Sequence, residues 1–262
     1  MLDLPGLRLH LEEQGQGPSL VLVHGFGGSL HSWDRLAPLL VPGRHVLRFD
    51  LRDFGESRAD SAAAFTHASD LAALLEARSI ARCDLAGVSL GGGVALGFAL
   101  DHPDKVRRLV LISPQISGWE WSAPWRAAWA RITRAAHAGR MDEARLLWAA
   151  HPLFAAMPAV ATAALNDEIG RFAGRQWVRD NHAEVLPDIE RLHTLRVPTL
   201  LLTGERDMAE FRLMADIIAA SSEHVRRADI PGAGHMLHLE RPEECARHIE
   251  AFLKDQPAAG LD

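Results

Sequence analysis

The sequence predicts an α/β fold with a mostly parallel, doubly wound sheet and an inserted helical cap. Short β-branched or leucine-rich runs recur along the chain, and each is followed by a loop and often by a helical pattern of apolar residues. This alternation is typical of βα units. One long interval, residues 115–197, departs from it because it contains helical patterns and no convincing strand.

The individual elements follow from the same patterns. Strands are expected at residues 7–11, 20–23, 45–49, 83–86, 108–112, 198–203 and 225–230. Helices are expected at 66–78, 92–100 and 242–253, and within the interval at 123–137, 141–150 and 159–172, from apolar spacing and acidic or proline starts. We therefore predict a core domain of residues 1–114 and 198–262 and a cap of residues 115–197.

The predicted cap is rich in tryptophan. It holds six of the seven tryptophans, namely Trp119, Trp121, Trp125, Trp129, Trp148 and Trp177. Trp125, Trp129 and Ile132 share one helix face, which either packs the cap onto the sheet domain or lines an apolar acyl pocket. The cap also carries four arginines whose orientation the sequence leaves open: Arg126, Arg131, Arg134 and Arg145.

Composition excludes several classes of function. The chain of 262 residues is 48% apolar and 24% charged, as in a globular protein with one sizeable core. Its net charge of −6 comes without a basic stripe, so we expect no nucleic-acid partner. The start of the chain lacks the pattern of a secretory signal, and no apolar run has membrane-spanning length. We expect a cytoplasmic protein without a membrane partner, and Cys83 and Cys245 need no disulfide.

The strongest local signal is the G-x-S-x-G sequence at residues 87–91. It follows the expected strand 83–86 and leads into the expected helix 92–100, which is the context that exposes a serine nucleophile on a sharp turn. The glycines on either side permit that turn, and the start of the helix favours developing negative charge. Ser89 is therefore the candidate nucleophile.

A serine nucleophile needs a base that takes its proton. His235 is the candidate because it lies in a glycine-containing loop directly after the expected last strand, 225–230. His238 is its local competitor. Other histidines are interpreted as surface residues: His67, His102, His182 and His248.

The base in turn needs a carboxylate that holds its tautomer. Asp207 fits this role because it ends the turn that leaves the expected strand 198–203, and Glu205 is the rival. The order Ser89, Asp207, His235 along the chain is the order expected for a serine hydrolase built on a parallel α/β sheet.

An acyl-transfer site also needs backbone donors for the oxyanion. Residues 24–28, H-G-F-G-G, directly follow the expected strand 20–23. The N–H groups of Phe26 and of Leu90, the residue after the nucleophile, are the expected donors. We expect His24 to brace this loop, and the Phe26 and Leu90 side chains to line the pocket floor.

Taken together, these motifs resemble the α/β-hydrolase superfamily over nearly the whole chain apart from the cap. Residues 50–57, DLRDFGES, are similar to its D-x-R-G-x-G-x-S loop, with Asp53 in place of a glycine, and residues 231–235 resemble its P-G-x-G-H turn. The sequence is similar to the esterase and enol-lactonase group. This resemblance implies an α/β-hydrolase fold that cleaves small to medium, largely apolar carboxylic esters through an acyl-enzyme.

Neither a cofactor nor a metal is expected, since no cluster of ligands has metal spacing and the glycines after Ser89 lack the lysine of a phosphate-binding loop. The same catalytic residues also serve lactones, thioesters and carbon–carbon bonds, so these reactions are the alternatives. A ligand-binding receptor and a cofactor-free lyase or oxygenase are the alternatives of a different class. The sequence does not indicate an oligomeric state.

Overall fold

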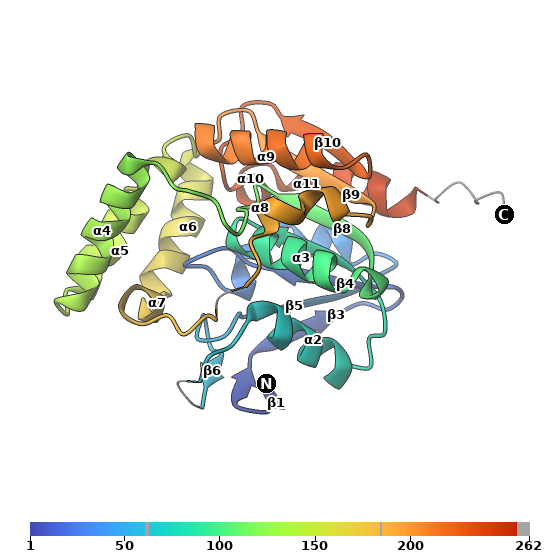
Figure 1. Cartoon of the computed structure of the whole chain (residues 1–262), viewed down its shortest axis with the longest axis horizontal. Helices are drawn as coiled ribbons and strands as arrows, with labels where there is room; N and C mark the ends of the chain where they lie inside the picture. The colour runs from blue at the N-terminus through green and yellow to red at the C-terminus, as the bar shows by residue number, and fades with distance from the viewer. Residues whose placement is uncertain (61–62, 184, 256–262) are drawn as a thin grey trace.

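The computed structural model of the protein describes residues 1–60, 63–183 and 185–255. Its main sheet has seven strands: β3 (Leu11–Gln14), β4 (Ser19–Val23), β5 (His45–Phe49), β7 (Cys83–Val88), β8 (Val106–Ile112), β9 (Thr199–Gly204) and β10 (Val225–Ile230). Across the sheet their order is β10-β9-β8-β7-β4-β5-β3, and β3 alone pairs antiparallel with its neighbour. The predicted α/β class and mostly parallel sheet are confirmed (Figure 1).

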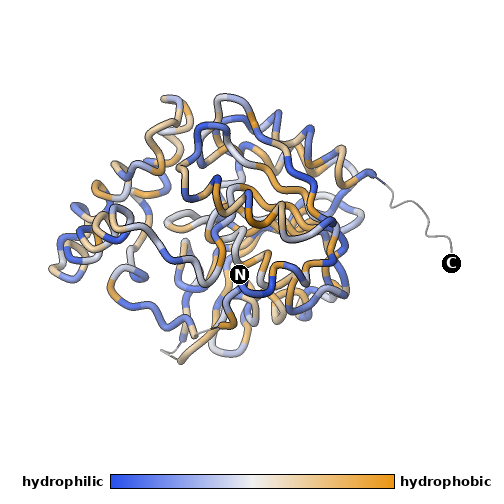
Figure 2. Tube along the Cα trace, turned by 45° about the horizontal axis from the view of Figure 1, so that its top comes forward, coloured by the Kyte–Doolittle hydropathy of each residue, from blue (hydrophilic) through white to orange (hydrophobic). Residues whose placement is uncertain are grey.

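Helices cover both faces of this sheet because alternate residues of its central strands point in opposite directions. In β4, Val21 and Val23 belong to one buried cluster, and Leu20 and Leu22 belong to another. The first cluster includes side chains of α2 (His67–Ala77), α3 (Leu90–Asp101) and α9 (Ala209–Ser221). The second includes those of η1 (Leu30–Trp33), α1 (Ala37–Leu40), α10 (Leu237–Glu240) and α11 (Pro242–Lys254). Figure 2 shows the apolar segments running through the interior between these layers.

The predicted strand 7–11 is wrong as a single element. Leu7–Leu9 forms β2 of a small three-stranded sheet with β1 (Leu2–Leu4) and β6 (Arg58–Ala59), whereas Leu11 begins β3 of the main sheet. His10 lies at the crossing, where its N–H donates to Ser57 Oγ and its carbonyl accepts the Asp50 N–H, each over 2.9 Å. These two hydrogen bonds redirect the chain from one sheet to the other.

Between β8 and β9, the described residues form helices and no strand. The helices are α4 (Ala123–His137), α5 (Met141–Ala149), α6 (Ala159–Arg171), α7 (Arg175–Val178) and α8 (Asp188–Arg191). Figure 1 shows α4 to α7 grouped on one side of the sheet domain. Short 3-10 turns complete the chain: η2 (Pro103–Lys105), η3 (Pro152–Phe154) and η4 (Leu192–Thr194). The division into a core and a cap at residues 115 and 197 stays a prediction.

The first cap helix begins where its sequence dictates. Ser122 caps α4, because its hydroxyl accepts the Trp125 N–H over 3.4 Å, and Pro124 occupies the first turn, where its missing N–H costs no hydrogen bond.

Among the helices of the described residues, none combines the length and apolar composition needed to cross a bilayer.

Candidate active site

Ser89 occupies a strained turn between β7 and α3. Its backbone has φ 54° and ψ −118°, a region that residues other than glycine enter at a cost. The turn is so tight that a Cβ atom on Gly87 would lie 2.1 Å from the carbonyl oxygen of Gly91. The Ser89 N–H donates to Ile112 of β8 over 3.0 Å. The strand–turn–helix context predicted for Ser89 is therefore present, at the carboxyl edge of the sheet.

Asp207 and His235 lie together at the same edge, beyond the ends of β9 and β10. The His235 Nδ1 atom is 3.1 Å from each carboxylate oxygen of Asp207, and both side chains are sealed from solvent. Across the described residues, His235 Nε2 forms no hydrogen bond, and none joins it to Ser89 Oγ. The structure thus brings the predicted base and carboxylate into contact and leaves the second ring nitrogen of the base unpartnered.

The two rivals have other positions. Glu205 is exposed, and its carboxylate accepts the Gly232 N–H over 2.8 Å, which ties its turn to the loop of His235. His238 is buried against Trp33, and the centroids of the two rings are 5.1 Å apart. Burial lowers the pKa of His238 to about 3, so its ring is neutral. Neither rival makes the contact that joins Asp207 to His235.

The glycine-rich loop after β4 lies against the nucleophile turn. A Cβ atom on Gly25 would be 3.3 Å from the Cβ atom of Ser89. His24 braces this loop as expected, because its Nδ1 is 2.8 Å from the Gly25 carbonyl oxygen and its Nε2 accepts the Leu51 N–H over 2.9 Å. In the described turns and loops, the Phe26 N–H donates to no backbone carbonyl, and Leu90 is the first residue of α3, whose N–H has no helical partner. Among the described residues, neither N–H group donates a hydrogen bond, as the predicted oxyanion role requires.

Asp53, which departs from the family's glycine, is accommodated without distorting the loop. Its φ of 62° is the left-handed conformation that a glycine adopts readily. Its carboxylate accepts the Ala59 N–H over 3.0 Å and contacts Arg175 at 3.3 Å. An aspartate tolerates this conformation because its short side chain forms such local hydrogen bonds.

The cap tryptophans lie over the predicted oxyanion loop. The Phe26 ring is 5.1 Å from Trp129 and 5.6 Å from Trp148, and Trp125 lies 5.9 Å from Phe211, whose ring is 4.3 Å from that of His235. These tryptophans therefore pack against Phe26 and Phe211, next to the predicted oxyanion loop and His235. The four cap arginines do not line the cavity described below: Arg126, Arg131 and Arg134 are exposed, and Arg145 donates to the Phe172 carbonyl.

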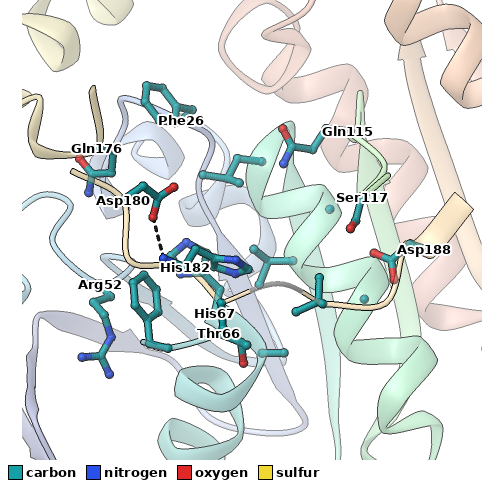
Figure 3. A pocket seen from close by; sticks show the side chains of 18 of the residues that line it. Phe26, Arg52, Thr66, His67, Gln115, Ser117, Gln176, Asp180, His182 and Asp188 are labelled. Atoms are coloured by element: carbon teal, nitrogen blue, oxygen red, sulfur yellow. Dashed lines mark hydrogen bonds between the residues drawn. The ribbon is translucent and has the colours of Figure 1, made fainter. Parts of the chain in front are cut away.

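A cavity of about 770 Å³ lies beside this loop (Figure 3). Phe26 and Leu90 line it, whereas Ser89, Asp207 and His235 do not, so the cavity meets the nucleophile turn from the side of Phe26 and Leu90. Its wall also carries polar groups from the end of the cap, including Gln176 and His182. Figure 3 shows Gln176 beside Phe26, and His182 beside His67.

His67 was expected at the surface, and this prediction is wrong. Its side chain is buried in the cavity wall, with its ring 5.1 Å from those of Phe65 and His182. Burial, and then the neighbouring His182, lower the pKa of His67 to about 3. The covering segment comes from far along the chain, where His182 forms a parallel bridge with Phe65. The local sequence at the start of α2 carries no signal of this cover.

Two of the three arginines in the cavity wall, Arg52 and Arg191, form ion pairs, whereas among the described residues the exposed Arg179 donates to the neutral side chain of Asn181 over 3.1 Å. Arg52 binds both carboxylate oxygens of Asp70 at 2.6 and 2.8 Å, and Arg191 binds Asp188 at 2.7 Å. The bond to Asp70 raises the pKa of Arg52, so it stays charged and paired. The wall is thus more polar than the sequence predicts, without offering these two cations to an anionic ligand.

Comparison with known proteins extends these observations. The chain is 26% identical over 288 residues to the 2-hydroxymuconate semialdehyde hydrolase of Pseudomonas sp. strain CF600, an alignment that covers 98% of this chain and 94% of the relative. Its fold is similar to that of the enol-lactonase from Burkholderia xenovorans LB400, with a TM-score of 0.78 and 22% identity over 95% of this chain and 98% of the other. A thermophilic esterase from Thermogutta terrifontis also has a TM-score of 0.78, at 24% identity over 95% and 93% of the two chains.

Residues 18–242 match the family described as alpha/beta hydrolase fold. This match spans β4 to the start of α11, and it includes Ser89, Asp207 and His235 together with the interval between β8 and β9. The protein belongs to the α/β-hydrolase superfamily.

Proposed function

We propose that the protein is a serine hydrolase that cleaves carboxylic ester bonds of small to medium, largely apolar substrates. The observation that carries this proposal is the buried contact between Asp207 and His235, whose second ring nitrogen forms no hydrogen bond with the described residues, at the sheet edge that also carries Ser89. Both ring nitrogens of His238 are also buried and unpartnered, so it is the contact with Asp207 that distinguishes His235. A general base needs its second nitrogen free for the nucleophile's proton.

The proposed reaction runs through an acyl-enzyme. Ser89 Oγ attacks the ester carbonyl while His235 Nε2 takes its proton and then delivers it to the leaving alcohol. Asp207 holds the Nδ1 proton and stabilises the imidazolium. The Phe26 and Leu90 N–H groups donate to the oxyanion. Water, activated by His235, then releases the acid.

The lining of the cavity supports the proposal that the acyl group of the substrate is uncharged. Its wall next to the proposed oxyanion donors includes the apolar side chains of Phe26, Phe54, Leu90 and Val94, together with the amides of Gln115 and Gln176. Arg52 is engaged by Asp70, so a substrate carboxylate that bound Arg52 would have to displace an ion pair in a partly buried site. An apolar acyl chain meets no such cost.

Lactone, thioester and carbon–carbon bond hydrolysis are the alternatives on the same residues, because such reactions differ mainly in the shape and polarity of the pocket. A receptor role, or a cofactor-free lyase or oxygenase, would need no acyl-enzyme. Labelling with an organophosphonate separates these classes. We expect a mass increase on Ser89 in the parent protein and none in Ser89→Ala.

The proposal is tested with p-nitrophenyl esters from acetate to dodecanoate. We expect turnover of at least one ester, and a loss on the order of 10⁴-fold or more in Ser89→Ala. Ser221→Ala is the matched control, because Ser221 ends α9 away from the site and donates to the Ile217 carbonyl over 2.7 Å. No turnover by folded parent protein would reject the ester assignment for simple acyl groups.

A further inference from the structure

His151 is a buried cap histidine that the reaction above does not use. It directly precedes η3 and is 4% exposed. Its ring lies between two cap tryptophans, with centroids 4.7 Å from Trp125 in an edge-to-face arrangement and 5.3 Å from Trp148. The imidazole is thus held by packing on both sides.

The hydrogen bonding of His151 determines its tautomer. The Leu153 N–H donates to His151 Nδ1 over 3.2 Å, which caps the start of η3. Because a neutral imidazole has one N–H and one acceptor nitrogen, the proton must lie on Nε2. Burial, and then the nearby His235, lower the pKa of His151 to about 4, against a smaller opposing influence of Glu210. At neutral pH the ring therefore presents an uncharged Nε2–H donor.

This donor has no protein acceptor. The part of the chain that the structure describes provides no hydrogen bond to His151 Nε2, and the atom is not among the unpartnered atoms sealed from solvent, unlike Nε2 of His235. An N–H donor among apolar side chains destabilises the protein unless an acceptor forms a hydrogen bond with it. The position suits an acceptor that arrives with a ligand.

His151 lies on the His235 side of the site. The Phe211 ring contacts both His235, at 4.3 Å between centroids, and Trp125, at 5.9 Å. The segment after His151 also touches the His235 loop, since a Cβ atom on Gly234 would lie 3.0 Å from Ala156 Cβ. The cavity of Figure 3 is lined by Phe26 and Leu90, and neither His151 nor His235 is among its lining residues.

The proposed reaction assigns the two portions of an ester to these two regions. The catalytic histidine returns its proton to the leaving oxygen, so the alcohol portion leaves on the side of His235. The acyl portion then occupies the cavity beside the oxyanion donors. His151 consequently borders the alcohol portion.

We propose that His151 Nε2–H donates a hydrogen bond to an oxygen of the leaving alcohol, and that the protein selects esters of alcohols bearing an ether, hydroxyl or carbonyl oxygen near the scissile bond. This inference rests on the proposed ester hydrolysis. His151 is in this view a specificity residue of the alcohol subsite.

Three substitutions of His151 distinguish the role of its Nδ1 acceptor from that of its Nε2–H donor. His151→Asn keeps an acceptor for the Leu153 N–H, because asparagine is a good helix cap, but its short side chain removes the distal donor. His151→Gln places an amide N–H near the position of Nε2 and loses the cap. His151→Phe removes both functions and keeps the packing between the tryptophans. His137→Asn, at the exposed end of α4, is the matched control.

The test compares a 2-methoxyethyl ester with the butyl ester of the same acid, which has the same number of non-hydrogen atoms. The quantity measured is the kcat/KM for the methoxyethyl ester divided by that for the butyl ester. Comparing this ratio between the parent and a variant cancels the difference in intrinsic reactivity between the two esters. We expect the preference for the methoxyethyl ester to fall roughly three- to tenfold in His151→Asn and His151→Phe, as loss of one neutral hydrogen bond predicts. We expect His151→Gln to recover part of it, and His137→Asn to leave it unchanged.

An unchanged ratio in His151→Asn, with both esters still cleaved, overturns this inference and leaves the ester assignment standing. Failure of the parent to cleave either ester rejects the ester assignment, and this inference with it. Nitrogen-15 NMR tests the donor without turnover: we expect a neutral Nε2–H ring between pH 6 and 8, and a ring that becomes charged in that range overturns the assignment of a fixed neutral donor.

Discussion

The Nδ1 atom of His235 lies 3.1 Å from both carboxylate oxygens of Asp207, and the two side chains are fully sealed from solvent. They come from loops that follow neighbouring parallel strands, β9 and β10. Because the carboxyl ends of parallel strands share one edge of the sheet, residues 28 positions apart meet there. A carboxylate in this position fixes the proton of His235 on Nδ1 and keeps Nε2 free to act as a base.

Asp207→Asn is expected to lower kcat about 10³- to 10⁴-fold, because the asparagine amide can donate to Nδ1 and so place the imidazole proton on Nε2. The measurement is kcat on the best ester, with circular dichroism to verify folding. Glu205→Gln is the matched control on the same turn, and we expect its kcat to stay within about twofold, since its exposed carboxylate binds only the Gly232 N–H. Equal losses in the two variants would contradict the assignment of Asp207.

Backbone strain at Ser89 predicts a gain in stability when this serine, the candidate nucleophile, is replaced by glycine. Its φ of 54° costs a residue with a Cβ atom about 1 kcal/mol or more, whereas glycine adopts it freely. We expect Ser89→Gly to have a free energy of unfolding about 1 kcal/mol above that of Ser89→Ala, with both inactive. Urea unfolding measures the difference. In Ala163→Gly, on the exposed face of α6, the same comparison should reverse in sign; a Ser89→Gly variant no more stable than Ser89→Ala would argue against strain.

Glu168 predicts a loss of stability as pH rises. It is buried on α6 against Gly28, where a Cβ atom would lie 3.2 Å from its Oε2. Burial raises the pKa of Glu168 to about 8. The negative charges of Asp34 and Asp50 add to this rise, and Arg171 opposes it. Between the unfolded value near 4.5 and about 8, only the folded state holds this proton, so unfolding releases it and stability falls as pH rises.

We expect Glu168→Gln to lack this fall, because its side chain carries no titrating proton. The free energy of unfolding of the variant minus that of the parent should therefore rise by about 1.4 kcal/mol for each pH unit between 5 and 8. Urea unfolding at pH 5, 6.5 and 8 measures the difference. Asp167→Asn, on the exposed face of the same helix, should show no such trend. A difference between parent and Glu168→Gln that does not vary with pH would show that Glu168 is ionised in the folded state.

His238 predicts the opposite pH dependence. Burial lowers its pKa to about 3, so between about 3 and the unfolded value near 6.5 only the unfolded state is protonated. Stability is therefore lost as pH falls through this window. Compared with His238→Leu, the parent should lose about 2 kcal/mol more between pH 8 and pH 5.

Urea unfolding of both proteins at the two pH values measures this loss, and His193→Leu, at an exposed position of η4, serves as the control. If His238→Leu and the parent lose the same free energy on acidification, the ring of His238 is charged in the folded protein.

Much of the fold and the candidate site is predictable from sequence because the signals are local. The G-x-S-x-G motif specifies the turn at Ser89, and the loops of His24 and Asp207 each follow an apolar run recognisable as a strand. The loop of His235 follows the strand 225–230, in which apolar and charged residues are mixed. The strands 45–49 and 225–230 have the predicted limits. Parallel pairing then brings the carboxyl ends of β4, β7, β9 and β10 to one edge. Local pattern and one topological rule suffice for these features.

The remaining features depend on contacts between distant segments, which no local pattern records. His10 divides the predicted strand 7–11 only because Ser57 and Asp50 bind its backbone. Arg126, Arg131 and Arg134 are exposed because the apolar side of α4 packs inward. His67 is buried because the segment of His182 covers it.

By itself, the sequence determined the order of the chemical groups along the chain and the strands that carry them, since both follow from neighbouring residues. Only the tertiary structure decided which histidines are buried, which nitrogen of His151 carries the proton, and what lines the cavity. Burial and tautomer depend on partners that meet in space only after the chain has folded.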